Sequence, residues 1–317
     1  MPDRAASIDA LLQSAGWNKA KRIPLAGDLS SRRYTRLVQG DKTAILMDAG
    51  ANMTPFLTMT RWLADHGFSV PEVFSERAGQ GLILLEDLGD ISLTKHLESA
   101  AVSEIDPLCV DLLLELRATP APDLPAPDAE TLVEWTHLAD EHYPGVVTTD
   151  LAPFREILYA CLTEALKAPL TLSLRDFHAD NLMWLANRSD TARLGLLDYQ
   201  DAFLTHPCYD LVSYLTDART EVSPSRRADV LTQYLSRSGD EPAAFRMAFA
   251  AFSAQRNLRI LGIFTKSAAM GKAHHLSKLP RVYGYFTEAL HHTVFDKVRE
   301  QTLAALPDPT SVLKAYS

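Results

Sequence analysis

Three polar residues between positions 174 and 201 have the types and the spacing that phosphoryl transfer requires. The chain reads Leu-Arg-Asp-Phe-His-Ala-Asp-Asn over 174–181 and Leu-Leu-Asp-Tyr-Gln-Asp over 196–201. In kinase-type chemistry, one carboxylate orients and deprotonates the acceptor hydroxyl, while an amide and a second carboxylate hold magnesium ions on the ATP phosphates. This order predicts Asp176 as the catalytic base and Asn181 and Asp198 as the magnesium ligands.

Two short apolar runs, 182–185 and 194–197, are expected to place these residues. They flank a polar turn and read as a hairpin that carries Asp198 back beside Asp176 and Asn181. Magnesium prefers hard oxygen ligands and keeps some of its waters, so one amide, one carboxylate and phosphate oxygens suffice.

The chain before this block predicts a small β-rich unit over 24–88, and the chain after Gly89 is mostly helical. The expected strands and helix of the β-rich unit lie at 33–39, 43–48, 54–67, 70–75 and 82–86, where 54–67 is the helix. Apolar helical faces recur at 108–116, at 154–165 and from Tyr209 onward. Four prolines over 119–128 predict a semi-rigid loop there.

The composition narrows the class of protein. With 317 residues and a formal net charge of −9, the chain has room for two lobes but lacks the basic face of a nucleic-acid binder. No segment has the length and apolar character of a membrane span, and three scattered cysteines indicate no disulfide framework. We expect a soluble cytoplasmic protein, monomeric, that contacts neither nucleic acid nor membrane.

The catalytic block resembles that of the aminoglycoside phosphotransferase superfamily of kinase-like small-molecule phosphotransferases. Asp176, His178, Ala179 and Asn181 match its catalytic loop, and Tyr209 to Leu211 match the segment where an aspartate supports that loop. The resemblance implies an α+β, bilobal, protein-kinase-like fold that binds ATP and Mg²⁺. The small β-rich N-lobe would span 1–88, and the larger, mostly helical C-lobe would span 89–317, with the catalytic loop at 174–181 and the metal-binding hairpin reaching 198.

Within that superfamily, three segments look most like the sugar kinases of cell-wall recycling. These segments are 24–34, 45–49 and 84–90. The resemblance implies that the acceptor is a small polar amino sugar, N-acetylmuramate or N-acetylglucosamine, phosphorylated at its anomeric hydroxyl.

Two expected residues of the broader kinase pattern are missing. Met47 stands where a phosphate-pairing lysine is expected, and the helix over 54–64 contains no answering acid. Some other cation must then meet the phosphates, and Arg32 and Arg33 are the candidates. The nucleotide loop is expected at about 25–34.

Other residues are assigned to the nucleotide and the acceptor by the resemblance or by weaker patterns. Ser30 and Ser31 would offer N–H groups and hydroxyls to phosphate oxygens, and the chain at Glu86 and Leu88 would present backbone groups to adenine. The candidate acceptor contacts are His178, Glu134, Trp135 and Arg256. Asp201 is either close to the metal site or a loop cap.

Three alternatives stay open on the same sequence. An aminoglycoside kinase would need clustered acids for its ammonium groups, and a choline or amino-alcohol kinase would need an aromatic cage. A nucleotide-binding pseudokinase would explain the missing lysine and glutamate. The intact set of Asp176, Asn181 and Asp198 argues against the pseudokinase.

Overall fold

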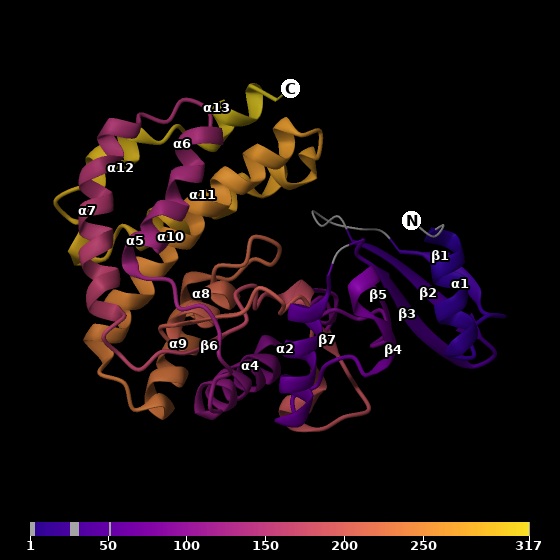
Figure 1. Ribbon diagram of the computed structural model, residues 1–317. Coiled ribbons are helices and arrows are strands. Elements are labelled where there is room, and N and C mark those ends of the chain that lie inside the picture. Colours follow the sequence, from indigo (N-terminus) through magenta and orange to yellow (C-terminus); the bar gives the residue numbers. More distant parts are fainter. Residues whose placement is uncertain (1–3, 26–31, 51, 317) are drawn as a thin grey trace. The chain divides into compact units, whose positions relative to one another are not determined.

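The computed structural model describes residues 4–25, 32–50 and 52–316, and the chain divides into two compact units (Figure 1). The first unit holds the residues up to His96 together with Asn181–Asp201, and the second holds Leu97–Asp180 and the chain from Ala202 onward. These units are groups of mutual contacts. Their boundaries differ from the predicted boundary between two lobes at residue 88, and that lobe boundary stays a prediction.

The first unit is built on a five-stranded antiparallel sheet in the order β1-β2-β3-β5-β4. Its elements are α1 (Arg4–Ser14), β1 (Lys21–Pro24), β2 (Arg33–Gln39), β3 (Lys42–Asp48), α2 (Thr54–Asp65), β4 (Val73–Arg77), η1 (Ala78–Gln80), β5 (Leu82–Glu86), α3 (Leu93–His96), β7 (Leu182–Trp184), η4 (Asp190–Arg193) and β8 (Leu194–Leu196). β7 and β8 form a separate two-stranded sheet.

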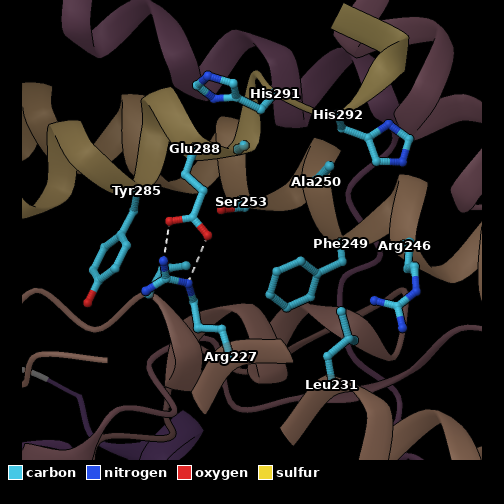
Figure 2. Close-up of a pocket in the computed structure, with 12 residues that line it drawn as sticks. Arg227, Leu231, Arg246, Phe249, Ala250, Ser253, Tyr285, Glu288, His291 and His292 are labelled. Atoms are coloured by element: carbon cyan, nitrogen blue, oxygen red, sulfur yellow. Dashed lines mark hydrogen bonds and ion pairs between the residues drawn. The ribbon is translucent and has the colours of Figure 1, made fainter. Parts of the chain in front are cut away.

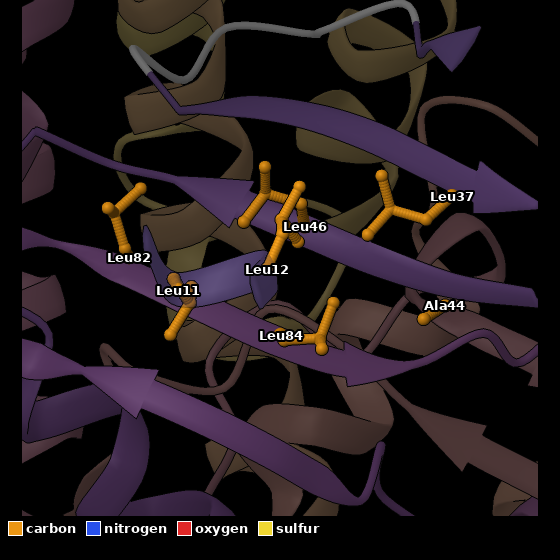
Figure 3. Close-up of a cluster of buried hydrophobic side chains, with 7 residues drawn as sticks. All are labelled: Leu11, Leu12, Leu37, Ala44, Leu46, Leu82 and Leu84. Carbon is orange, nitrogen blue, oxygen red and sulfur yellow. The ribbon is translucent and has the colours of Figure 1, made fainter. Parts of the chain in front are cut away.

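Alternating apolar residues give this sheet a buried face. Leu46 of β3 and Leu82 and Leu84 of β5 lie on that face and pack against Leu11 and Leu12 of α1 (Figure 3). Their neighbours along the strands must point to the opposite face, because successive strand side chains alternate. The cluster therefore fixes both the register of the sheet and the position of α1.

The sequence patterns found most of this unit. The strands over 33–39 and 82–86 are confirmed, and Gly40, at φ +61°, makes the two-residue turn between β2 and β3. The prediction omitted α1 and β1. β1 is exposed along its whole length, so no apolar alternation marks it in the sequence. The hairpin strand predicted from Val70 begins at Val73.

The second unit is mostly helical. Its elements are α4 (Val102–Ala118), α5 (Ala129–Glu134), η2 (Trp135–His137), α6 (Leu138–His142), α7 (Thr148–Ala165), β6 (Thr171–Ser173), β9 (Phe203–Thr205), α8 (Cys208–Leu215), α9 (Pro224–Ser238), α10 (Pro242–Ala269), η5 (Ala273–Lys278), α11 (Leu279–Ala289), η6 (Thr293–Phe295), α12 (Arg299–Ala305) and α13 (Pro309–Lys314). One further turn, η3 (Ala179–Asn181), lies where the chain passes from the second unit to the first.

The long helix α10 is the centre of this second unit. It contacts α6, α7, α8 and α11. At Gly262 a β-carbon would lie only 2.5 Å from the carbonyl group of Leu138, so only glycine allows α6 to lie this close to α10. The segment η2, which carries Trp135, is thereby held against the same helix.

The proline-rich segment 119–128 contains no helix, as predicted. The N–H of Leu204 donates to the carbonyl of Pro125 at 2.8 Å, which ties this loop to β9. No helix in the described part of the chain is long and apolar enough to cross a membrane.

Candidate active site

The candidate catalytic loop follows β6 and is held at its start by Asp210 on α8. The Asp210 carboxylate accepts hydrogen bonds from the N–H of Leu174 at 2.6 Å, the N–H of Arg175 at 3.1 Å and the hydroxyl of Ser173 at 2.8 Å. Burial raises the pKa of Asp210 to about 6, against the effect of these three donors. The expectation that Asp210 supports the loop is confirmed.

A second buried acid holds the far end of the loop. Asp217, directly after α8, accepts a hydrogen bond from the N–H of Ala179 at 3.1 Å. Arg219 then pairs with Asp180 at 3.1 Å. The loop is thus fixed at both ends by one helix and the residues that follow it, which the sequence analysis recognised only for Asp210.

Asp176 pairs with a buried arginine of α10. The Nη2 atom of Arg256 lies 3.2 Å from Oδ1 of Asp176, and its Nη1 donates to the carbonyl of Arg175 at 3.1 Å. Burial acts to raise the pKa of Asp176. The charges of Arg256, His178 and Arg175 outweigh that effect and hold the pKa below its usual value. Asp176 is therefore an ionised carboxylate at neutral pH, and its side chain is 40% exposed and accessible.

The two predicted magnesium ligands come from the β7–β8 hairpin in the first unit. The N–H of Leu197 donates to the carbonyl of Asn181 at 2.9 Å, which extends the hairpin pairing by one step beyond the register of Leu182 with Leu196. Leu197, the residue before Asp198, is therefore the direct partner of Asn181 in the hairpin. Asp198 has a left-handed backbone at φ +58°, which for a residue other than glycine stores strain.

A cation already lies against the Asp198 carboxylate. The Nη1 atom of Arg32 lies 3.2 Å from Oδ1 of Asp198 and donates to Oε1 of Gln200 at 2.8 Å. The Asp198 side chain is 45% exposed. The half-exposed Asp198 carboxylate and the side-chain amide of Asn181 are both hard oxygen donors, and the guanidinium of Arg32 shows that Asp198 attracts positive charge. These donors fit magnesium.

The residue after Asp198 links the hairpin to α2, a connection that the sequence analysis missed. The Tyr199 ring stacks on Phe56 at 5.4 Å, and its hydroxyl lies 2.9 Å from the hydroxyl of Thr60. Tyr199 is fully buried. The only hint in the sequence was an aromatic residue next to the predicted metal-ligand aspartate. α2 therefore holds this segment through a stacked ring and a hydroxyl contact.

The structure describes the nucleotide residues only in part. Ser30 and Ser31 lie outside the described residues, as does most of the expected nucleotide loop. Arg33 is exposed, and Met47 is buried in the sheet, opposite Tyr34 and Ile83. Met47 is thus a core residue.

Glu86 and Leu88, the two residues predicted to present backbone groups to adenine, differ in how their backbone is used. The N–H of Glu86 donates to the carbonyl of Glu72 at 2.8 Å, and its side chain pairs with Arg188 at 3.3 Å. Within the described residues, the backbone of Leu88 makes no hydrogen bond. Leu88 therefore offers the N–H and C=O groups that a ring such as adenine could use.

The candidate acceptor residues fall in different surroundings. Trp135 lies beneath two guanidinium groups, with its ring centre 5.1 Å from Cζ of Arg175 and 5.0 Å from Cζ of Arg259. Glu134 is mostly exposed and only 3.9 Å from His137. His178 is buried, and its backbone N–H donates to the carbonyl of Asp176 at 2.9 Å.

A cavity of about 300 Å³ lies elsewhere in the second unit, between α9, α10 and α11 (Figure 2). Arg227 and Glu288 form an ion pair at its edge, and Phe249 and Arg246 line it from α10. None of the predicted catalytic, metal or acceptor residues lines it.

Comparisons with known proteins show the family of the chain. Residues 21–247 match the family described as "Phosphotransferase enzyme family". A protein of Caulobacter vibrioides named N-acetylmuramate/N-acetylglucosamine kinase is 31% identical, with 89% of this chain and 91% of that protein covered. One of the same name from Pseudomonas aeruginosa is 27% identical over 95% of this chain and 94% of its own length.

Solved structures with similar folds are small-molecule kinases. A choline/ethanolamine kinase family protein from Mesorhizobium loti superposes with a TM-score of 0.68 at 14% identity, over 95% of this chain and 96% of that one. A choline kinase from Streptococcus pneumoniae gives 0.64 at 13% identity, over 90% and 99%. The fold is the protein-kinase-like α+β fold that the sequence predicted.

The family match, together with the kinase-like fold, defines the class of the protein as a phosphotransferase. The chain belongs to the phosphotransferase enzyme family. It is an ATP-dependent kinase.

Proposed function

We propose that the protein transfers the γ-phosphoryl group of ATP to the anomeric hydroxyl of N-acetylmuramate or N-acetylglucosamine. The observation that carries the proposal is the ionised, accessible Asp176, paired with Arg256 in a loop fixed from α8. The names of the two curated relatives support the acceptor class.

In this mechanism Asp176 orients the acceptor hydroxyl and takes its proton as the bond to phosphorus forms. Asn181 and Asp198 would hold magnesium, which supplies neutralising charge on the phosphate oxygens. Arg32 is the cation nearest that position, so it would move from Asp198 to the phosphates. This assignment gives Arg32 the task that lysine has in other kinases, because Met47 is buried in the sheet.

The remaining contacts complete the proposal. Ser30, Ser31 and Arg33 would meet the phosphates, the backbone at Glu86 and Leu88 would meet adenine, and His178 would orient the loop. We also propose that the reaction takes place in the cytoplasm, because ATP is available there, and that the protein acts as a monomer.

The test is ADP release with ATP and magnesium on a panel of acceptors. The panel holds N-acetylmuramate, N-acetylglucosamine, other hexoses, choline and several aminoglycosides. We expect selective turnover of the N-acetyl sugars, with phosphorus NMR showing an anomeric phosphate. Asp176→Asn should lower kcat by roughly 10²- to 10⁴-fold, the range for loss of a general base.

Other outcomes would favour the alternatives. Turnover of aminoglycosides or choline alone would replace the sugar with that acceptor. ATP binding without turnover of any acceptor would favour the pseudokinase. Asp176→Asn activity within a few-fold of wild type would remove the catalytic role of Asp176.

A further inference from the structure

Three arginines gather around the catalytic carboxylate in the second unit. Arg256 and Arg259 lie on α10, one helical turn apart, and Arg175 directly precedes Asp176. We call Arg175, Arg256 and Arg259, with Trp135, the arginine cluster. The Cζ atoms of Arg175 and Arg259 lie 5.1 and 5.0 Å from the centre of the Trp135 ring, so both guanidinium groups pack against the same indole.

The cluster holds more positive charge than its own residues neutralise. Arg256 is ion-paired with Asp176. Within the described residues, no carboxylate lies at ion-pair distance from the guanidinium of Arg175 or of Arg259. Burial lowers the pKa of Arg259, and the charges of Arg175 and Arg256 lower it further, although Tyr209 and Asp176 act against this.

Two partly buried guanidinium groups that share one ring, with no carboxylate at ion-pair distance, repel one another and are costly to hold together. Arginine is the residue that recognises planar anions, because its fork of N–H groups matches the two oxygens of a carboxylate. Packing against the Trp135 ring restricts both side chains and so reduces the entropy lost when an anion binds. The arrangement is therefore preorganised for an anion.

The place of the anion follows from the spacing on α10. Arg256 holds Asp176, the residue proposed to meet the reacting hydroxyl. Arg259 lies three residues further along the helix, a rise of about 4.5 Å. An anion bound by Arg259 would therefore lie away from the reacting hydroxyl, by roughly the size of part of a sugar ring. That position suits a carboxylate on the acceptor better than it suits the phosphoryl group being transferred.

We propose that Arg259, with Arg175, binds a carboxylate of the acceptor and that this contact favours acidic amino sugars over neutral ones. The inference rests on the proposed function. N-acetylmuramate carries a lactyl carboxylate, whereas N-acetylglucosamine and the methyl ester of N-acetylmuramate carry none, so the three compounds separate recognition of the carboxylate from recognition of the shared sugar.

The experiment measures kcat and KM of the wild type, Arg259→Gln and Arg259→Lys on these three acceptors. Loss of a charge-assisted contact should raise KM for N-acetylmuramate about 10- to 100-fold in Arg259→Gln. KM for the two neutral acceptors should stay within about twofold, and kcat should change little. Arg259→Lys keeps the charge but not the fork, so it should recover part of the affinity.

The matched control is Arg246→Gln, because Arg246 is an exposed arginine of the same helix. It should change none of the three KM values. Calorimetric binding of N-acetylmuramate and its ester, with thermal melting of each variant, gives a readout that does not depend on turnover.

Two results would overturn the inference. An equal change on all three acceptors would assign Arg259 to the fold or to the phosphate, and no change would remove it from acceptor binding. Failure of the proposed function is distinct, because the wild type would then turn over neither sugar.

Discussion

Replacing Arg256 by methionine tests how Asp176, the proposed catalytic base, is kept ionised. Arg256 is buried and makes two contacts in the catalytic loop, one to Asp176 and one to the carbonyl of Arg175. A hydrogen bond to a charged group contributes about 1.5–3 kcal/mol. The Asp176 side chain is 40% exposed, so we take the low end of this range, about 1.5 kcal/mol, which is roughly a tenfold loss of kcat.

The pH dependence gives a second, independent consequence. Three neighbouring cations hold the pKa of Asp176 below its usual value, and Arg256 has the largest effect of the three. Without Arg256 that pKa must rise, so the acidic limb of the kcat profile should move to higher pH. The assay is ADP release between pH 4.5 and 8 on the best sugar acceptor.

The controls separate charge from packing. Arg256→Lys keeps a cation near Asp176 and should leave the acidic limb closer to that of the wild type. Arg246→Met removes an exposed charge from the same helix and should change nothing. The reasoning fails if Arg256→Met keeps the wild-type limb, because Arg256 would then not set the ionisation of Asp176.

Three further predictions concern other parts of the molecule. Arg32→Ala should raise KM for ATP at least tenfold, and an unchanged KM would remove Arg32 from phosphate binding. Tyr199→Phe loses its bond to Thr60 and should lower the free energy of unfolding by about 0.5–1.5 kcal/mol in urea; no loss would refute that bond. Burial lowers the pKa of His206 to about 4, so stability should fall by roughly 3 kcal/mol from pH 7 to 4. His206→Gln should show a shallower loss in that window, and an equal slope would exclude His206 as its source.

The sequence predicted the parts of the site that depend on local spacing. The hairpin that pairs Asn181 with Leu197 follows from two short apolar runs around a polar turn, and the supporting role of Asp210 followed from the family resemblance of Tyr209 to Leu211. These features need only a few neighbouring residues.

Contacts between distant segments could not be predicted in the same way. Nothing local to Arg256 reveals that it pairs with a residue 80 positions earlier, and the contacts of Trp135 with Arg175 and Arg259 join three segments that lie far apart in the sequence. Likewise, Tyr199 reaches Thr60 across 139 residues. A single sequence contains no signal for such pairings, since each residue alone would fit an ordinary buried or surface position.

The left-handed backbone at Arg175 and Asp198 has a consequence for directed evolution. Each position holds a side chain in a conformation that costs about 1–2 kcal/mol and that glycine adopts freely. A library screened only for heat resistance should therefore enrich glycine at both positions. Such a screen would select against a proposed acceptor contact and a proposed metal ligand together, so raising the heat resistance of this enzyme requires a parallel selection for turnover.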